Sequence, residues 1–308
     1  MSRQLVLVHG RSQQDKEPGA LKAEWLEALD AGLARSGLSL PIDEADVRFP
    51  YYGDTLQDLT KGATPDAAAE VVVRGNGDPE SDGEPDEDER RFLAAVLEEV
   101  RLRSGITEEQ LASAGGEDVI ERGPLDWQWV RATLRAVDRY IPHGSGTTLA
   151  LATRDVFHYL SDPDARNTID AGVRSALTPE REAVVVGHSL GSVVAYRVLR
   201  DATASGGLRI PLFLTVGSPL GVTEIRKRLK RSAIARTPEV VQRWHNAMDI
   251  RDVVALYPLT PQHFPLNPVE PGIENSTNVK NRTANRHGIS GYLDDPGVAK
   301  LIYDGLVG

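Results

Sequence analysis

The sequence predicts an α/β fold, in which a mostly parallel sheet carries helices on both faces and a helical cap is inserted between two strands. Continuous runs of apolar, β-branched residues at 5–8 and 183–186 are typical of parallel strands that are buried on both faces. Each run ends at a glycine-containing turn and is followed by apolar residues at helical spacing, as in residues 21–33. From about 60 to 170 this alternation is lost and helical patterns dominate.

Length and composition limit the class of protein. With 308 residues and 40% hydrophobic content, the chain can bury a large core, which we place at 1–59 and 171–308, with the cap at 60–170. The chain has no cysteine, which excludes disulfides and thiolate chemistry. The net charge of −10 argues against nucleic acid or an anionic membrane surface as the main partner. No apolar run is long enough for stable membrane insertion, so we expect a cytoplasmic protein.

The first part of the core is predicted to contain a strand at 5–8, a helix at 21–33 and a short strand at 46–49. The turn that follows the second strand carries Tyr51 and Tyr52. These two rings either line the mouth of a pocket or pack on the loop, and packing is the commoner outcome for such aromatic side chains.

The predicted cap begins with an acidic segment, because eight Asp and Glu residues lie between 78 and 89 together with two prolines and a glycine. Such a composition does not bury enough apolar surface to fold, so we predict a disordered acidic loop near 76–90. Its spacing matches no calcium-binding loop, and no metal site is predicted. Helices of the cap are predicted at 90–102, 108–114, 125–140 and 148–160, and a helix at 167–177 is predicted to return the chain to the sheet. The aromatic residues of the cap are expected to form its packing core rather than a substrate cage: Trp127, Trp129, Phe157 and Tyr159.

The second part of the core contains the remaining predicted elements. After the run at 183–186 and its helix, strands are predicted at 210–216, within 240–255 and at 276–279, and a last helix at 298–306. The basic segment from Arg226 to Arg231 stands out in an acidic protein. It is interpreted as a solvated helix end, with docking of an anionic group or a protein partner as the alternative.

Residues 187–191 read G-H-S-L-G and fit the pattern G-x-S-x-G between a buried strand and a helix. In that context the turn is so tight that Gly187 and Gly191 are needed to avoid collisions, and the Ser189 hydroxyl is raised above the sheet. The free N–H groups at the start of the next helix point at any negative charge that develops there. We therefore predict that Ser189 is a nucleophile; the alternative is a structural glycine-rich turn.

A reactive serine requires a histidine base and a carboxylate that orients it, and in this kind of fold they follow the serine in the order acid, then histidine. Only His263 and His287 follow the candidate acids Asp249 and Asp252. His263 lies in a proline-rich segment only eleven residues after Asp252, which leaves no room for a strand between acid and base. We therefore predict His287 as the base. Asp252 is preferred as the acid, and Asp249 stays open.

The loop after the strand at 5–8 lies at the same sheet edge as Ser189, where ligands bind in open α/β sheets. A backbone N–H of Arg11 or Ser12 in this loop can join the N–H of Leu190 to form an oxyanion hole. The alternative is an ordinary glycine turn between a strand and a helix.

Five segments together resemble the α/β-hydrolase superfamily, and in particular its lipase-like and esterase-like bacterial members. They are L-V-H-G-R-S at 7–12, G-H-S-L-G-S at 187–192, V-G-S-P-L-G at 216–221, D-I-R-D-V-V at 249–254 and H-G-I-S-G-Y-L at 287–293. The resemblance covers roughly the first 55 and the last 135 residues.

The resemblance implies an α/β-hydrolase fold with Ser189 as nucleophile, His287 as base, Asp252 as acid and an oxyanion hole near Arg11 and Leu190. Arg11 departs from the family pattern, in which small or apolar residues are common beside the oxyanion loop.

These residues predict a serine hydrolase that cleaves carboxylic esters or related acyl substrates through an acyl-enzyme intermediate. Such chemistry needs no metal or organic cofactor, and the expected partner is a small acyl substrate. Esters, thioesters and amides all remain open as substrates. The alternative is a non-enzymatic interaction or effector module that keeps the hydrolase fold and binds a protein partner through the cap or through Arg226 to Arg231.

Overall fold

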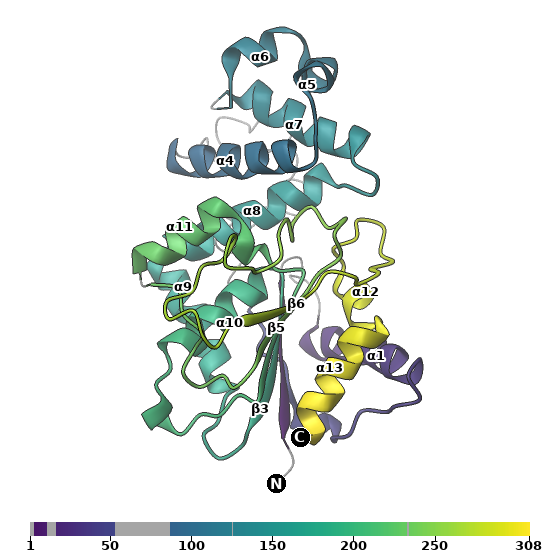
Figure 1. Ribbon diagram of the computed structural model, residues 1–308, viewed down its shortest axis with the longest axis vertical. Helices are drawn as coiled ribbons and strands as arrows, with labels where there is room; N and C mark the ends of the chain where they lie inside the picture. Colours follow the sequence, from purple (N-terminus) through teal and green to yellow (C-terminus); the bar gives the residue numbers. More distant parts are fainter. Residues whose placement is uncertain (1–2, 11–16, 53–86, 125, 233) are drawn as a thin grey trace.

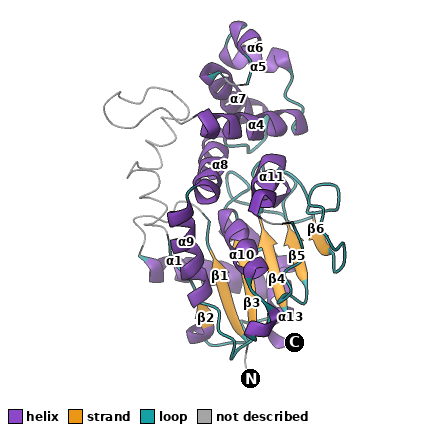
Figure 2. Ribbon diagram, turned by 90° about the vertical axis from the view of Figure 1, so that its left-hand side faces the viewer, coloured by secondary structure: helices purple, strands orange, loops and turns teal. Residues whose placement is uncertain are grey.

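The computed structural model describes residues 3–10, 17–52, 87–124, 126–232 and 234–308. Six strands form one parallel sheet in the order β2-β1-β3-β4-β5-β6 (Figure 2). Figure 1 shows the same sheet edge-on. The strands are β1 (Gln4–Val8), β2 (Val47–Arg48), β3 (Ala183–His188), β4 (Leu212–Val216), β5 (Trp244–Ala247) and β6 (Ile273–Ser276). The central strands β1, β3 and β4 are buried along their whole length, as their continuous apolar sequences predict.

Helices cover both faces of this sheet, which confirms the predicted α/β class. One apolar cluster joins one face of the central strands to α1, α12 and α13, and a second joins the opposite face to α9 and α10. The helices outside the insertion are α1 (Pro18–Ala34), α9 (Pro163–Ser175), α10 (Leu190–Asp201), α11 (Thr223–Ser232), α12 (Ile289–Leu293) and α13 (Pro296–Val307). Short 3₁₀ turns lie at Glu44–Asp46, Ala204–Gly206 and Pro219–Gly221.

The strand order reverses direction between β1 and β3. The chain continues from β1 to β2 on one side of the sheet, and from β3 to β4, β5 and β6 on the other. At such a switch point the two loops leave the carboxyl edge in opposite directions, which opens a crevice where ligands bind in open α/β sheets. Gly10 follows β1 and Ser189 follows β3, so both lie at this position.

Of the described helices between β2 and β3, five lie beyond the carboxyl edge of the sheet (Figures 1 and 2). They are α4 (Glu87–Arg103), α5 (Glu108–Gly115), α6 (Asp118–Arg122), α7 (Trp127–Tyr140) and α8 (Gly146–Ser161). Trp129 and Phe157 are buried and Trp127 packs against the same apolar cluster. Tyr159 is also buried, but it contacts Asp170 of α9 and Arg197 of α10. The aromatic residues are thus packing core, as expected. Helix α9 begins at 163 and packs on α10, so the returning helix starts within the range 60–170 that the sequence assigned to the cap.

Two predicted boundaries are wrong for identifiable reasons. Glu87, Asp88 and Glu89 form the first turn of α4 rather than part of an acidic loop, because carboxylates are favourable beside the free N–H groups of a helix start. The rest of the acidic run, 78–86, lies outside the described residues. The strand predicted at 276–279 instead forms at Ile273–Ser276. This edge strand is only partly buried, so it lacks the apolar pattern that would reveal it.

Smaller differences concern the ends of strands and the short helices. Strand β4 begins at Leu212 because Pro211 has no N–H to donate to the neighbouring strand. Strand β5 ends at Ala247, so Asp252 lies within the following loop rather than directly after the strand. The short helices α6 and α12 were not predicted.

Tyr52 is buried and stacks on His9 at 3.9 Å between ring centres, so this ring packs in the structure.

Helix α11 connects the sheet region to the inserted helices. The Glu99 carboxylate of α4 accepts hydrogen bonds from the N–H and hydroxyl of Thr223, at 3.0 and 2.8 Å, and so caps the start of α11. One turn later, the Arg228 guanidinium lies 4.9 and 4.7 Å from the ring centres of Phe92 and Phe157. Arg228 also binds the Asp88 carboxylate at 2.8 Å.

The basic segment thus contributes contacts within the chain. Besides the contacts of Arg228, the Arg226 guanidinium donates to the carbonyl of His263. Lys227 forms an exposed pair with Glu224. Across the parts of the chain that the structure describes, no helix is both long enough and apolar enough to cross a lipid bilayer.

We expect Arg228→Ala to lower the free energy of unfolding by about 2 kcal/mol, because it removes a cation that packs between two buried rings. Lys227→Ala is the matched control on the same helix, and its exposed ion pair contributes about 0.5 kcal/mol or less. Urea unfolding of both variants provides the measurement. Equal midpoints for the two variants would show that Arg228 does not hold the inserted helices to the core.

Candidate active site

Ser189 lies at the turn between β3 and α10, with backbone angles of φ 53° and ψ −127°. A positive φ is uncommon outside glycine and is maintained here by the surrounding packing. A β-carbon on Gly187 would lie 2.8 Å from the α-carbon of Ser192, and one on Gly191 would collide with the carbonyl oxygen of Val8. Both glycines of the motif are therefore required by the close approach of neighbouring backbone. The tight strand-to-helix turn expected from the sequence is present.

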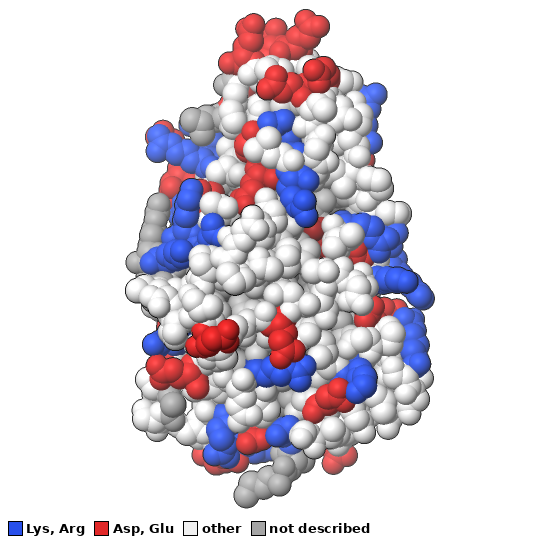
Figure 3. All heavy atoms as spheres, viewed as in Figure 1, with Lys and Arg blue, Asp and Glu red and all other residues white. Residues whose placement is uncertain are grey.

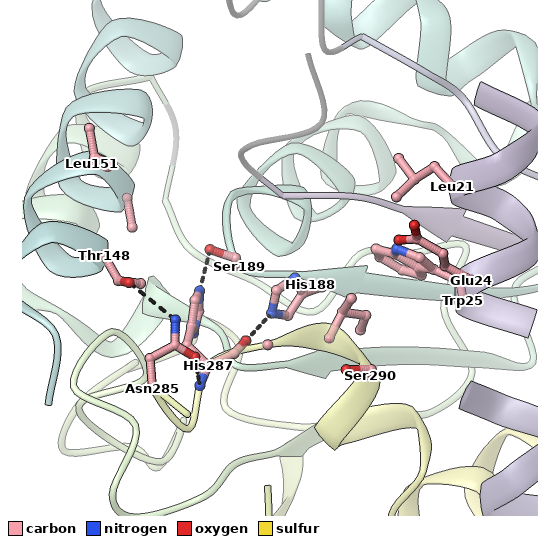
Figure 4. Close-up of a pocket in the computed structure, with 13 residues that line it drawn as sticks. Leu21, Glu24, Trp25, Thr148, Leu151, His188, Ser189, Asn285, His287 and Ser290 are labelled. Atoms are coloured by element: carbon pink, nitrogen blue, oxygen red, sulfur yellow. Dashed lines mark hydrogen bonds between the residues drawn. The ribbon is translucent and has the colours of Figure 1, made fainter. Parts of the chain in front are cut away.

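The structure brings His287 to Ser189. Its Nε2 atom lies 2.9 Å from the Ser189 hydroxyl (Figure 4). His287 belongs to the loop between β6 and α12, and the two side chains are separated by 98 residues in sequence. Both are buried in the protein. This geometry fits a hydroxyl that donates to an unprotonated imidazole nitrogen.

The opposite nitrogen of the same ring contacts Asp252. His287 Nδ1 lies 2.8 Å from Asp252 Oδ2, and the other carboxylate oxygen accepts the N–H of Val254 at 2.9 Å. Asp252 is 2% exposed. A carboxylate can only accept, so Nδ1 carries the proton and Nε2 keeps the lone pair that faces Ser189. The three residues thus form a continuous line of hydrogen bonds.

The carboxylate of Asp249, the alternative acid, has partners other than the His287 ring. It binds the Arg251 guanidinium and accepts the N–H of Asn281 at 2.9 Å. Burial acts to raise the pKa of Asp249, but the hydrogen bonds from Arg251 and from the two backbone N–H groups hold it below its ordinary value. Asp249 therefore anchors the loop that leads to His287, while Asp252 meets the ring.

His188, the residue between Gly187 and Ser189, has a contact that the sequence did not reveal. Its Nε2–H donates to the backbone carbonyl of His287 at 2.8 Å, and the rings of His188 and Trp25 meet edge to face. Burial, and then the charge of His287, lower the pKa of His188 well below 6.5, so the ring is neutral. A neutral imidazole with a fixed tautomer can hold the His287 backbone in place. Its partner lies 99 residues away, so no local pattern could identify it.

His9 fixes the loop on the other side of the nucleophile. Its Nδ1–H donates to the carbonyl of Gly10 at 2.7 Å, and its Nε2 accepts the N–H of Tyr52 at 3.1 Å. The Tyr52 hydroxyl in turn donates to the carbonyl of His9. A β-carbon on Gly10 would lie 2.8 Å from that of Ser189, so this loop packs directly against the nucleophile.

Of the two residues predicted to donate to an oxyanion, the structure describes Leu190 but not Arg11. Leu190 is the first residue of α10, so its N–H has no acceptor within the helix and lies next to Ser189. Arg11, and Ser12 with it, lie outside the described residues. Gly10, directly before Arg11, is in contact with Ser189.

A cavity of about 300 Å³ opens beside Ser189 (Figure 4). Its apolar side chains come from α1, α8 and the residue after Gly288, and its polar side chains come from α1, α8, His188 and the segment 285–290. The apolar side chains are Leu21, Trp25, Leu151, Ala152 and Ile289, and the polar ones are Glu24, Thr148, His188, Asn285 and Ser290. A concave, mostly apolar site with a few converging polar groups is the usual form of a small-molecule site.

The inserted helices contact the loop that carries His287. The Asn285 side chain accepts the N–H of His287 at 3.1 Å and donates to the Thr148 hydroxyl of α8 at 3.1 Å. Arg286 donates to His143, in the loop before α8, at 2.9 Å. The position of the base is therefore held from the insertion as well as from the sheet.

A second serine and histidine pair occurs at the sheet edge. His245 of β5 contacts Ser276 at 2.8 Å and Glu274 at 3.2 Å, both in β6. Ser276 is the last residue of an extended strand, and no helix begins after it. The pair therefore lacks the strained turn and the helix start that distinguish Ser189. It is best described as a polar contact across two neighbouring strands.

Burial lowers the pKa of His9 to about 4, against 6.5 in the unfolded chain. Because the folded pKa is depressed, the stabilisation is complete above pH 6.5 and is lost as the pH falls through the interval down to about 4. Between pH 7 and 5, the protonation of this residue alone lowers the free energy of unfolding by about 2 kcal/mol. The variant His9→Asn keeps a hydrogen-bond donor for the Gly10 carbonyl but does not titrate. Between pH 7 and 5 we expect its free energy of unfolding to fall by about 2 kcal/mol less than that of the natural protein. Urea unfolding at both pH values measures the difference, and an unchanged pH dependence would contradict the assignment.

Comparison of the chain with models of protein families, with curated proteins and with solved structures found no match. The parallel α/β sheet therefore rests on the structure itself, and the function has to be argued from the arrangement around Ser189.

Proposed function

We propose that this protein is a serine hydrolase of the α/β-hydrolase type, which cleaves carboxylic esters or related acyl compounds through an acyl-enzyme intermediate. The observation that carries the proposal is the line of hydrogen bonds from Ser189 through His287 to Asp252, with contacts of 2.9 and 2.8 Å. Nucleophile, base and orienting acid within hydrogen-bond reach are the arrangement that acyl transfer requires.

In the first step the Ser189 oxygen attacks the acyl carbon, and its proton passes to His287 Nε2. Asp252 stabilises the resulting imidazolium through Nδ1–H. Negative charge develops on the former carbonyl oxygen, where the Leu190 N–H at the start of α10 donates a hydrogen bond. The proton then moves from His287 to the leaving group, whose bond to the acyl carbon breaks.

In the second step water attacks the acyl-enzyme. His287 takes a proton from the water, the Leu190 N–H stabilises the new oxyanion, and collapse of the intermediate returns the proton to Ser189. The acid is released and the hydroxyl is restored. Neither step changes the net charge of the site once the proton transfers are complete, which suits a nucleophile that is 2% exposed.

The cavity supports a small acyl group rather than a large ligand. Its volume of about 300 Å³ lies at the lower end of the range for ligand pockets. Leu151 and Ala152 of α8 form part of its apolar wall. The inserted helices therefore supply side chains that limit the acyl group, whereas the sheet supplies the reacting groups.

We expect a fluorophosphonate to form one covalent adduct with the natural protein and none with Ser189→Ala, because the probe reacts with serines that a base activates. Ester hydrolysis should fall by roughly 10⁴–10⁶-fold in Ser189→Ala. Intact-protein mass and initial rates are the measurements.

Ser276→Ala is the matched control, since it removes the other serine that contacts a histidine. It should keep both the adduct and the activity. Absence of labelling in the natural, folded protein would reject the hydrolase and favour the alternative, an interaction module on the same fold.

We also expect Leu151→Ala to move the acyl preference toward longer chains by roughly tenfold in kcat/KM, since one added methylene in an apolar pocket changes binding by about 1–3 kcal/mol. A series of acyl esters of increasing length measures the shift. Leu149→Ala, a buried residue of the same helix that does not line the cavity, is the control for general destabilisation. An identical shift in both variants would exclude Leu151 as a determinant of chain length.

A further inference from the structure

Tyr292 contacts the same carboxylate oxygen that orients His287. It lies in α12, is fully buried, and its hydroxyl is 2.7 Å from Asp252 Oδ2. The backbone N–H of Asp249 points at the Tyr292 oxygen at 3.3 Å. The hydroxyl therefore accepts from one backbone group and donates to one carboxylate oxygen, which fixes its orientation.

The donor role of Tyr292 follows from its surroundings. Burial, and then the charge of Asp252, raise the pKa of Tyr292 well above 10, so the hydroxyl stays protonated. A β-carbon on Gly217 would lie 2.9 Å from the Tyr292 ring and 3.3 Å from Asp252 Oδ2. Gly217 has φ +56°, a backbone conformation that favours glycine. The absence of a side chain at 217 thus leaves room for the contact between ring and carboxylate.

All acceptor positions of Asp252 are then accounted for. Oδ1 receives the N–H groups of Val254 and Ala255, at 2.9 and 3.3 Å, and Oδ2 receives Nδ1–H of His287 and the Tyr292 hydroxyl. Each carboxylate oxygen offers two lone pairs. Tyr292 and His287 therefore share Oδ2, and each donor reduces the negative charge available to the other.

We propose that Tyr292 is a positioning residue of this site, which holds Asp252 Oδ2 in line with His287 and moderates how strongly that carboxylate attracts the imidazole proton. The inference rests on the function proposed above, because it concerns the same line of hydrogen bonds. Tyr292 does not reach the substrate; it acts through Asp252.

Few other ionisable groups face this cluster in the described chain. His188 packs against the His287 ring at 4.9 Å and is neutral, and Asp249 is paired with Arg251. Arg286 adjoins His287 in sequence and donates to His143 and to a backbone carbonyl. None of these groups contacts Oδ2, so removal of the Tyr292 hydroxyl changes one hydrogen bond of that oxygen.

The test compares the titration of His287 in three forms of the protein, followed by NMR of nitrogen-labelled histidine without substrate. Tyr292→Phe should raise the midpoint by roughly half a pH unit to one unit, because Oδ2 loses a donor and attracts the imidazolium more strongly. A 3,5-difluorotyrosine at position 292 is a stronger donor of similar shape and should lower the midpoint. A residue that only fills space would not produce shifts of opposite sign.

Tyr196→Phe is the matched control. Tyr196 is also a buried tyrosine, but its hydroxyl contacts the backbone of Arg236. Its loss should destabilise the protein without moving the His287 midpoint. Equal midpoints in the natural protein, Tyr292→Phe and the difluorotyrosine form would overturn the proposal. Should the Phe variant fail to fold, the near-isosteric fluorinated form alone decides the question.

Kinetics separate this inference from the proposed function. If the natural protein reacts with the fluorophosphonate, the acid limb of its pH–rate profile should move in the same direction as the midpoint in each variant. Labelling without any such movement would reject the role of Tyr292 and leave the hydrolase intact. Loss of labelling in the natural protein would reject the hydrolase itself.

Discussion

The close approach of two backbone segments underlies the whole site. Gly191, at the start of α10, lies against the carbonyl oxygens of Val8 and His9, at the end of β1. A side chain at 191 would force the strand and the helix apart and relax the turn that holds Ser189. The contact is possible only because β1 and β3 are neighbours in the sheet, where Gln4 pairs with Ala183 and Val8 with Gly187, although 179 positions separate the two members of each pair.

Parallel pairing then determines where the other groups meet. All six strands end at the same edge, so the loops after β5 and β6 bring Asp252 and His287 to the residue that follows β3. Separate contacts stabilise this line of hydrogen bonds: the Val254 N–H holds Asp252, and His188 holds the His287 backbone. A site of this kind is pre-organised, since its donors and acceptors need little movement during reaction.

The parts of this arrangement that local sequence determines could be predicted. The run at 183–186 and the glycines around Ser189 specify a buried strand and a tight turn, so the position of the nucleophile follows from a few neighbouring residues. Chain order left His263 and His287 as candidate bases, and the short spacing between Asp252 and His263 favoured His287. Asp249 and Asp252 are three residues apart in one loop, and only the fold shows which of them faces the ring.

Other features depend on distant contacts and had no local signal. The hydrogen bonds of His188 and Tyr292 join residues 99 and 40 positions apart. Strand β6 is polar and partly exposed. Its extended conformation therefore depends more on pairing with β5 than on its own amino-acid composition. The first turn of α4 was predicted as a loop because its residues are acidic. The same charges are also favourable at the start of a helix, so composition alone could not decide between the two.

The bridge that Asn285 makes between Thr148 and His287 has a consequence for how such a protein can diverge. An insertion that shapes a cavity is the natural place for new selectivity, because it lies outside the sheet. Here, however, the Thr148 hydroxyl of the insertion also supports the loop that carries His287. If His287 is the base proposed above, a replacement of these helices that leaves out this hydroxyl would alter proton transfer along with selectivity.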